Sequence, residues 1–125
     1  MNPDAELIYF DTSSQWRDWL AENGTGNTEI WLGFYKKNSS KTGIAYEDAV
    51  NEALCYGWID GLTKRVDEDS YKIRFTPRKP KGNWSPYNIK RVEVLINSGK
   101  MTPAGLVHVA AAKADGRWGE ANNQK

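Results

Sequence analysis

The chain contains one cysteine and one histidine in 125 residues. A single cysteine excludes a disulfide bond within the chain, and these two residues are too few for a Cys/His zinc site, which needs about four such ligands. Gly24, Gly26 and Gly33 lack the spacing of a phosphate loop or a dinucleotide-binding loop. We therefore expect no metal and no cofactor.

Cys55 and His108 are the only residues that could form a nucleophile and base of the Cys/His type. His108 falls opposite the apolar stripe of its predicted helix, so we expect it to be solvated. Nothing in the sequence places it near Cys55, and local signatures of thiol catalysis are missing. We assign no catalytic residue.

Long apolar runs are also missing. No stretch approaches the roughly 20 apolar residues that cross a bilayer. The first residues, MNPDAELIYFD, carry acidic groups where a signal peptide is positively charged, and they lack its apolar segment of about 7–15 residues. We therefore expect a cytoplasmic protein without a membrane span.

Apolar and aromatic residues are nevertheless plentiful. Hydrophobic residues make up 39% of the chain and include six Trp and six Tyr, which excludes a disordered chain. A chain of this length can bury about two thirds of its unfolded surface in one core. We expect one domain over residues 1–118, followed by a frayed tail over residues 119–125.

Charge is unevenly distributed, although the net charge is only +1. Residues 1–60 carry 4 Lys/Arg and 10 Asp/Glu, whereas residues 61–125 carry 13 and 6. Eight cations lie between Lys72 and Lys100, and Glu93 is the only acidic residue among them. Such a segment is suited to attract an anion, and it is equally typical of a solvated surface.

The hydrophobic pattern predicts four short strands. Residues 7–10 form a short apolar strand, and residues 28–37 form a central strand that is apolar on both faces. Residues 63–67 and 71–76 form a hairpin, which residues 58–61 connect to the preceding helix. In the second hairpin strand Lys72, Arg74 and Thr76 share one face, and Tyr71, Ile73 and Phe75 share the other.

Four helices are expected between and after these strands. Thr12 and Gln15 form a capping box at the start of the first helix. Gly57 ends the second helix, Ser85 caps the third, and Thr102-Pro103 begins the fourth. The expected buried residues are Ala49, Val50, Ala53 and Leu54 in the second helix, Ile89, Val92, Leu95 and Ile96 in the third, and Leu106, Val107, Ala110 and Ala114 in the fourth. The fold class is therefore α+β, with a small mixed or antiparallel sheet of about four strands packed with about four helices.

One stretch, IRFTPRKPKGNWSPYN at residues 73–88, gathers cations in front of the third helix. Free N–H groups at a helix start attract anions, and Arg and Lys side chains can hold a phosphate or a carboxylate. A capped helix behind a solvated loop is the alternative. The candidate ligand-binding residues are Trp58, Asp60, Arg74, Thr76, Arg78, Lys79, Trp84, Ser85, Asn88 and Arg91.

Three of these residues also have structural interpretations. Asp60 is expected to pair with Arg74 or Arg78. Asn88 falls near the apolar face of its helix, so its amide needs partners, and we expect it to hold the loop over residues 77–83. Arg91 lies one turn further on and can reach that loop or an acidic residue.

Four segments have the order and spacing of a known family: EALCYGWIDG (52–61), RFTPRK (74–79), NWSPYNIKRVEVLINSGKMTPAG (83–105) and AKADGRW (112–118). On these motifs the chain resembles the YdeI/OmpD-associated family, whose members are also called bacteriocin-protection proteins. The resemblance implies a compact, usually bacterial domain linked to resistance against bacteriocins or cationic antimicrobial peptides and to an outer-membrane porin. It implies no established catalytic residues.

These observations lead to three hypotheses. The first is a non-enzymatic binding or protective module that recognises a small anion, or a protein partner, at the surface formed by residues 74–91. The second is a small-molecule enzyme that uses Asp60 in an aromatic pocket walled by Trp58 and Trp84. The third is binding of single-stranded nucleic acid, in which Tyr71, Phe75 and Trp84 stack on bases, although Tyr71 and Phe75 are expected to face the core. For cationic peptides, Glu47 and Asp48 in the acidic half are the candidate contacts.

Overall fold

The computed structural model describes residues 6–119. Its elements follow the order β1 (Leu7–Ile8), α1 (Ser13–Asn23), β2 (Ile30–Tyr35), α2 (Tyr46–Cys55), β3 (Trp58–Arg65), β4 (Ser70–Pro77), α3 (Pro86–Asn97) and α4 (Pro103–Ala114). A short helical turn at residues 117–119 follows. The α+β prediction is therefore confirmed. The expected frayed tail lies, apart from Gly119, outside the described residues.

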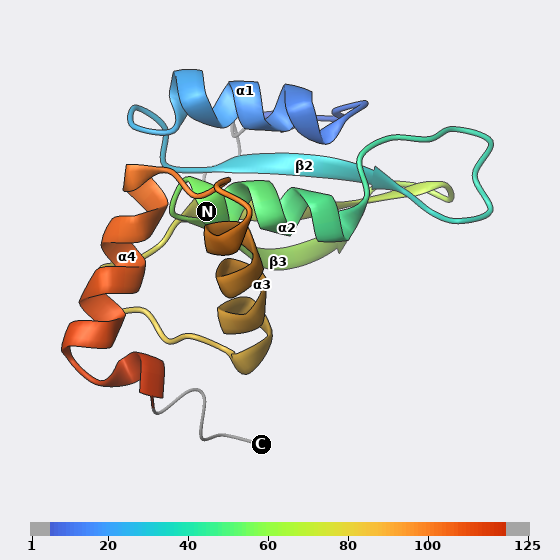
Figure 1. Cartoon of the computed structure of the whole chain (residues 1–125). Helices are drawn as coiled ribbons and strands as arrows, with labels where there is room; N and C mark the ends of the chain where they lie inside the picture. Colours follow the sequence, from blue (N-terminus) through green and yellow to red (C-terminus); the bar gives the residue numbers. More distant parts are fainter. Residues whose placement is uncertain (1–5, 120–125) are drawn as a thin grey trace.

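The four strands form one mixed sheet in the order β1-β2-β4-β3. β1 runs parallel to β2, and the β2–β4 and β3–β4 pairs are antiparallel. β2 therefore lies inside the sheet, as its apolar character on both faces predicts. Figure 1 shows α1 and α2 lying along the sheet, with α3 and α4 gathered beside α2.

The hydrophobic core lies between the sheet and α1 and α2. Trp16 of α1 is fully buried, its ring contacts Phe75 of β4 edge-on, and its indole N–H donates to the backbone oxygen of Ala49 in α2. Phe34 of β2 stacks on Tyr71 of β4 within the same cluster. Phe75 is fully buried and Tyr71 is partly buried against the core, so the prediction that both rings face the core is confirmed.

The opposite face of β4 carries the cations, as the alternation predicts. Arg74 lies beside Trp31 of β2, and Lys72 lies beside Gly33. The Lys72 ammonium sits 4.5 Å from the centre of the Trp31 ring, close enough for a cation–π contact. The sheet therefore separates an apolar layer from a cationic surface.

Local signals place the helix starts correctly. The Thr12 hydroxyl accepts from the Gln15 backbone N–H, and the Ser85 hydroxyl accepts from the Asn88 backbone N–H. Pro86 occupies the first turn of α3, where its missing N–H costs nothing. Thr102 caps α4 by position but uses its hydroxyl elsewhere, because it donates to the backbone oxygen of Cys55.

β3 begins earlier than the sequence predicts. Residues 58–61 were expected to connect α2 to the hairpin, but Trp58 already pairs with Pro77 of β4. Gly57 has a φ of +76°, a conformation that lets the chain turn directly from α2 into the strand. The register of the β3–β4 pair then shifts between Asp60 and Thr63, which is typical of a β-bulge or a similar irregularity, and Gly61 lies within this stretch.

The predicted inward face of α4 is wrong. Leu106 is 39% exposed and Val107 is 65% exposed, whereas the buried residues of α4 are Gly105, Val109 and Ala112. A Cβ on Gly105 would lie 2.5 Å from the backbone oxygen of Cys55, so α4 crosses the end of α2 at a distance that only glycine permits. This close crossing, rather than side-chain size, sets the inward face.

Two further side chains differ from prediction for related reasons. His108 was expected to be solvated, but it lies one turn after Gly105 and is half-buried against Gly57. Ile96 was expected to be buried, but it is 38% exposed, because the inward face of α3 is Ile89, Val92 and Leu95.

Candidate functional site

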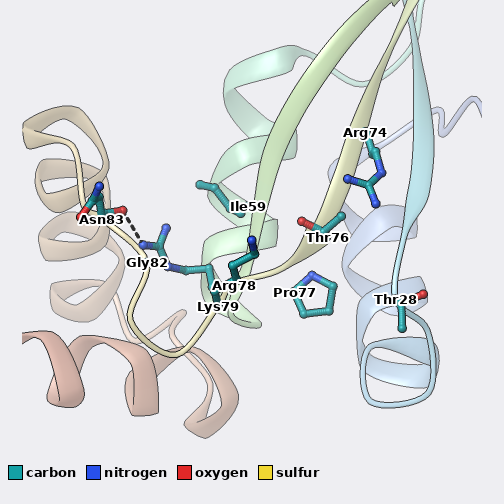
Figure 2. Close-up of a pocket in the computed structure, with 9 residues that line it drawn as sticks. All are labelled: Thr28, Ile59, Arg74, Thr76, Pro77, Arg78, Lys79, Gly82 and Asn83. Carbon is teal, nitrogen blue, oxygen red and sulfur yellow. Dashed lines mark hydrogen bonds between the residues drawn. The ribbon is translucent and has the colours of Figure 1, made fainter. Parts of the chain in front are cut away.

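A cavity of about 630 Å³ opens where β4 leaves the sheet and enters the loop before α3. Figure 2 shows Arg78 and Asn83 on one side of it, Arg74 and Thr28 on the other, and Thr76 and Pro77 between them. The lining residues are Thr28, Ile59, Arg74, Thr76, Pro77, Arg78, Lys79, Gly82 and Asn83. Small-molecule sites have volumes of roughly 300–1,000 Å³, so the cavity can hold a compact ligand.

The end of β4 positions Arg78. Pro77 has no N–H to extend the strand pairing, and the next residue turns away from the sheet. The backbone N–H of Arg78 donates to the oxygen of Gly57 at 2.8 Å, which ties the start of the loop to the end of α2. The side chain then lies over Trp84, with its guanidinium carbon 3.8 Å from the centre of that ring.

Arg78 is a buried cation whose charge is not balanced. Arg78 is only 8% exposed, and no carboxylate of residues 6–119 lies within 4.0 Å of its guanidinium. Nη2 donates to the backbone oxygen of Asn83 at 2.8 Å, but Nε is buried and has no hydrogen-bond partner in the same part of the chain. Buried charged groups normally have a partner, so this guanidinium calls for one.

The surroundings of Arg78 disfavour its charge without removing it. Burial, together with the positive charge of Arg117, lowers the pKa of Arg78 to about 10. At neutral pH the guanidinium therefore remains protonated, and its Nη1 group, which makes no hydrogen bond within the described residues and is not among the buried atoms, is a donor for an incoming acceptor.

Arg74, at the other side of the cavity, is already paired. Its Nε donates to a carboxylate oxygen of Glu29 at 2.5 Å, and the Glu29 side chain is 7% exposed. This pair fixes the side chain of Arg74 and balances its charge. Lys79 is exposed at the rim, and no carboxylate of the described chain pairs with it. The unbalanced charges of the cavity are therefore those of Arg78 and Lys79.

A segment after α4 holds in place the loop between β4 and α3, residues 78–85, which we call the cavity loop. Arg117 donates from Nη1 to the backbone oxygen of Gly82 at 2.7 Å and from Nη2 to that of Pro80 at 3.2 Å. Its Nε donates to Asp115, which balances its charge. Trp118 meets Trp84 edge-on, with ring centres 5.0 Å apart. We call residues 115–118 the C-terminal strap.

The structural interpretations of Asp60 and Asn88 are wrong. Asp60 pairs with neither arginine, because its carboxylate accepts a hydrogen bond from the Tyr46 hydroxyl at 2.7 Å. Asn88 does not hold the 77–83 loop, because its side-chain oxygen accepts from Arg91 at 2.7 Å. Asn88 pairs within its own helix α3, whereas the partner of Asp60 lies on α2, which the sequence did not place beside it.

Arg91 reaches an acidic residue rather than the loop. Its Nε and Nη2 each donate to a carboxylate oxygen of Glu47 at 2.7 Å, which makes a bidentate pair between α3 and α2. The Arg91–Glu47 pair and the Tyr46–Asp60 bond both join the start of α2 to its neighbours. They stabilise the arrangement of the elements and lie outside the lining of the cavity.

The structure brings together four of the ten candidate residues at the cavity: Arg74, Thr76, Arg78 and Lys79. Trp84 does not line the cavity, but its ring supports the guanidinium of Arg78, which does. Trp58 is fully buried against Trp19, and Ser85 is occupied as a helix cap. Neither Trp58, Trp84 nor Asp60 lines this cavity, so the proposed aromatic pocket around Asp60 has no support in it.

Five lining residues were missed: Thr28, Ile59, Pro77, Gly82 and Asn83. None carries a charge, and Thr28 and Ile59 come from segments distant in sequence. Arg117 was noted only as part of a motif. Pro77, Gly82 and Asn83 could have been predicted from their proximity to Arg78 in the sequence, whereas no sequence signal indicated Thr28 and Ile59.

The surroundings of Cys55 and His108 do not favour thiol catalysis. Burial raises the pKa of the Cys55 thiol, the opposite of what activates a nucleophile. Burial and the charges of Arg78 and Arg117 lower the pKa of His108 below its usual value. Within residues 6–119 no cluster of His, Cys, Asp or Glu could hold a metal ion, and no helix is long and apolar enough to cross a membrane.

The fold and the site define a small α+β domain with a cation-lined cavity at one end of its sheet. Residues 8–108 match the family described as "Domain of unknown function (DUF8412)", and the chain belongs to this family. No curated protein and no solved structure matches the chain. The C-terminal strap lies beyond the matched residues.

Proposed function

We propose that the chain is a non-enzymatic binding module that recognises a small anion through Arg78. The observation that carries this proposal is the buried, protonated guanidinium, which has an unpartnered Nε and lines a cavity of ligand size. The experiment that tests it is a comparison of anion-induced stabilisation between the natural chain and an Arg78 variant.

Binding of an anion at Arg78 should stabilise the folded chain. A buried charge without a counter-charge weakens the fold, because water no longer solvates it and nothing replaces that water. A phosphate or carboxylate oxygen at the Arg78 guanidinium would make a charge-assisted hydrogen bond, typically worth about 1.5–3 kcal/mol. Since the ligand would bind the folded chain only, it should raise the free energy of unfolding.

The chemistry of the lining supports binding rather than catalysis. The nine lining residues offer cationic groups, hydroxyls, an amide and apolar surface. They include no Asp, Glu, His or Cys, the groups that most often act as a general base or nucleophile. Cations and hydroxyls in a concave site are typical of anion recognition.

The first test is thermal unfolding of the whole chain in sodium phosphate and in sodium chloride at matched ionic strength. We expect phosphate to raise the melting temperature of the natural chain and of Lys90→Met, an exposed cation on α3 outside the cavity. Arg78→Met should not respond to phosphate beyond the chloride control. An equal response of Arg78→Met and the natural chain would refute the site.

The resemblance to the YdeI/OmpD-associated family suggests a biological role for this binding. We propose that the module contributes to protection against bacteriocins or cationic antimicrobial peptides; the support is the order of the motifs over residues 52–118. Bacteria that express the natural chain should survive a peptide challenge better than bacteria that express Arg78→Met at the same level. Equal survival would mean that the Arg78 site does not contribute to this protection.

A further inference from the structure

We propose that the anion recognised at Arg78 is the phosphate of an organic phosphate monoester, whose body lies on Ile59 and Pro77. This inference rests on the proposed function and adds the chemical class of the ligand. It follows from three features of the cavity, which are its volume, its unbalanced charge and the order of groups along it.

The volume points to an organic molecule. A cavity of about 630 Å³ is many times the roughly 30 Å³ that one water molecule occupies in the liquid. Inorganic phosphate at Arg78 would leave most of this space to water. Ile59 and Pro77 supply apolar surface inside the cavity, and contact with an apolar body would release the water from that surface.

The unbalanced charge favours a phosphate over a carboxylate. Glu29 balances Arg74, and Asp115 balances Arg117. Arg78 and Lys79 remain, so the lining presents two positive charges without acidic partners among residues 6–119. A phosphate monoester carries roughly −1.5 to −2 charges at pH 7, which matches this pair, whereas a carboxylate carries one.

The order of groups gives the direction of the ligand. In Figure 2 the guanidinium of Arg78 lies beside Asn83 at one side, and Thr28 and Arg74 lie at the opposite side. The phosphate therefore belongs at Arg78 and Lys79, and the body extends over Pro77 and Ile59 toward Thr28. Thr28 and Arg74 line the far end of the body, where a hydroxyl and a guanidinium would meet a polar group of the ligand.

Three probes test this assignment on the whole chain by isothermal titration at constant ionic strength: phenyl phosphate, inorganic phosphate and benzoate. We expect phenyl phosphate to bind at least about tenfold more tightly than either of the others. Backbone and Arg78 Nε–H shifts in ¹⁵N NMR spectra should place the bound probe at Arg78, Gly82 and Asn83.

Two β3 variants distinguish the contribution of the ligand's apolar body to the affinity from that of its phosphate. Ile59→Ala should remove the advantage of phenyl phosphate and leave the affinity for inorganic phosphate unchanged. Leu62→Ala, at a position 52% exposed on the same strand and outside the cavity lining, should change neither affinity. If Ile59→Ala does not fold, the comparison of the three probes on the natural chain still decides the question.

Each alternative outcome has one meaning. Equal affinities for phenyl phosphate and inorganic phosphate would overturn the organic body, and tighter binding of benzoate would overturn the phosphate; both would leave anion recognition at Arg78 intact. If none of the three probes shifts Arg78, the proposed function fails together with this inference.

Discussion

Arg78 lies over the ring of Trp84, with its guanidinium carbon 3.8 Å from the centre of the ring, and both residues are at least nine-tenths buried. The contact explains how the structure tolerates a cation without an acidic partner. The face of an indole ring attracts a cation by about 2 kcal/mol when water is excluded. The ring thus holds the charge in place and leaves the donor groups at its edge for a ligand.

Replacement of Trp84 should therefore affect stability and binding together. Trp84→Leu removes core volume and the ring beneath Arg78, and we expect the free energy of unfolding to fall by about 3–5 kcal/mol. Trp84→Phe keeps an aromatic face and should cost less. Urea unfolding of both variants checks this order, and a loss below about 1 kcal/mol for Trp84→Leu would show that the ring is not part of the core.

Replacement of Arg78 should separate binding from stability. Arg78→Met loses one hydrogen bond and the ring contact, but it also removes a desolvated charge, so these effects offset each other. We expect the free energy of unfolding without ligand to change by less than about 1.5 kcal/mol. Urea unfolding measures this change. A large loss would mean that Arg78 is a structural residue.

His108 provides a natural reporter for the charge of the site, because it is the only histidine in the chain. Its pKa is lowered by burial and by the charges of Arg78 and Arg117. Removal of the Arg78 charge by Arg78→Met, or its compensation by bound phosphate, should raise the pKa of His108. An NMR titration of the imidazole C–H signals measures both effects. If neither the variant nor phosphate moves the pKa, the two groups are not electrostatically coupled.

The same lowered pKa predicts the pH dependence of stability. The unfolded chain binds a proton at His108 near pH 6.5, whereas the folded chain does so only at lower pH. Stability should therefore fall as the pH decreases below about 6.5 toward the folded pKa, and His108→Gln should lose this part of the dependence. Thermal unfolding between about pH 5 and 7 checks the slope, and identical curves for both proteins would contradict the assignment.

The C-terminal strap should control the order of the cavity loop. Arg117→Met removes the donors to Gly82 and Pro80, so the loop should open more often. We expect hydrogen exchange of the Gly82 amide, which donates to Lys79, to become about tenfold faster. Exchange at the buried strand β2 should stay unchanged in the same experiment. Unchanged exchange at Gly82 would show that the loop does not depend on the strap.

Replacement of Gly105, where α4 crosses α2, should destabilise the fold, and Gly26 provides a control position. Gly105→Ala would place a Cβ 2.5 Å from the backbone oxygen of Cys55, and we expect a loss of about 1–3 kcal/mol from the strain. A Cβ added to Gly26 would have no other atom within 4 Å, so Gly26→Ala should be nearly neutral. Urea unfolding of the pair measures the difference. Similar stabilities would show that α4 can move away without cost.

Much of the fold could be predicted because its signals are local. The Thr12 hydroxyl accepts from the Gln15 backbone N–H at the start of α1, and the Gln15 side chain accepts from the Asp11 backbone N–H. Ser85 and Pro86 begin α3, and strict alternation puts Arg74 and Lys72 on one face of β4. Each of these features depends on residues a few positions apart. The α+β class followed from such elements in sequence order.

The rest depended on contacts between distant segments. The inward face of α4 followed from the close approach of Gly105 to Cys55, which no periodicity reveals. Asp60 found Tyr46 instead of an arginine, since the β-bulge and the start of α2 bring them together. Arg78 and Lys79 are among the candidate cations, and both line the cavity, but Thr28 and Ile59 reach it from other elements.

The most direct test of the central claim is a ¹⁵N-detected NMR titration that follows the Arg78 Nε–H signal of the whole chain with phosphate at constant ionic strength. If Arg78 binds an anion, this signal should shift and saturate, and the Gly82 and Asn83 amides should shift with the same affinity. If the Arg78 signal does not move while phosphate is raised to tens of millimolar, the buried guanidinium does not recognise this anion and the account is wrong.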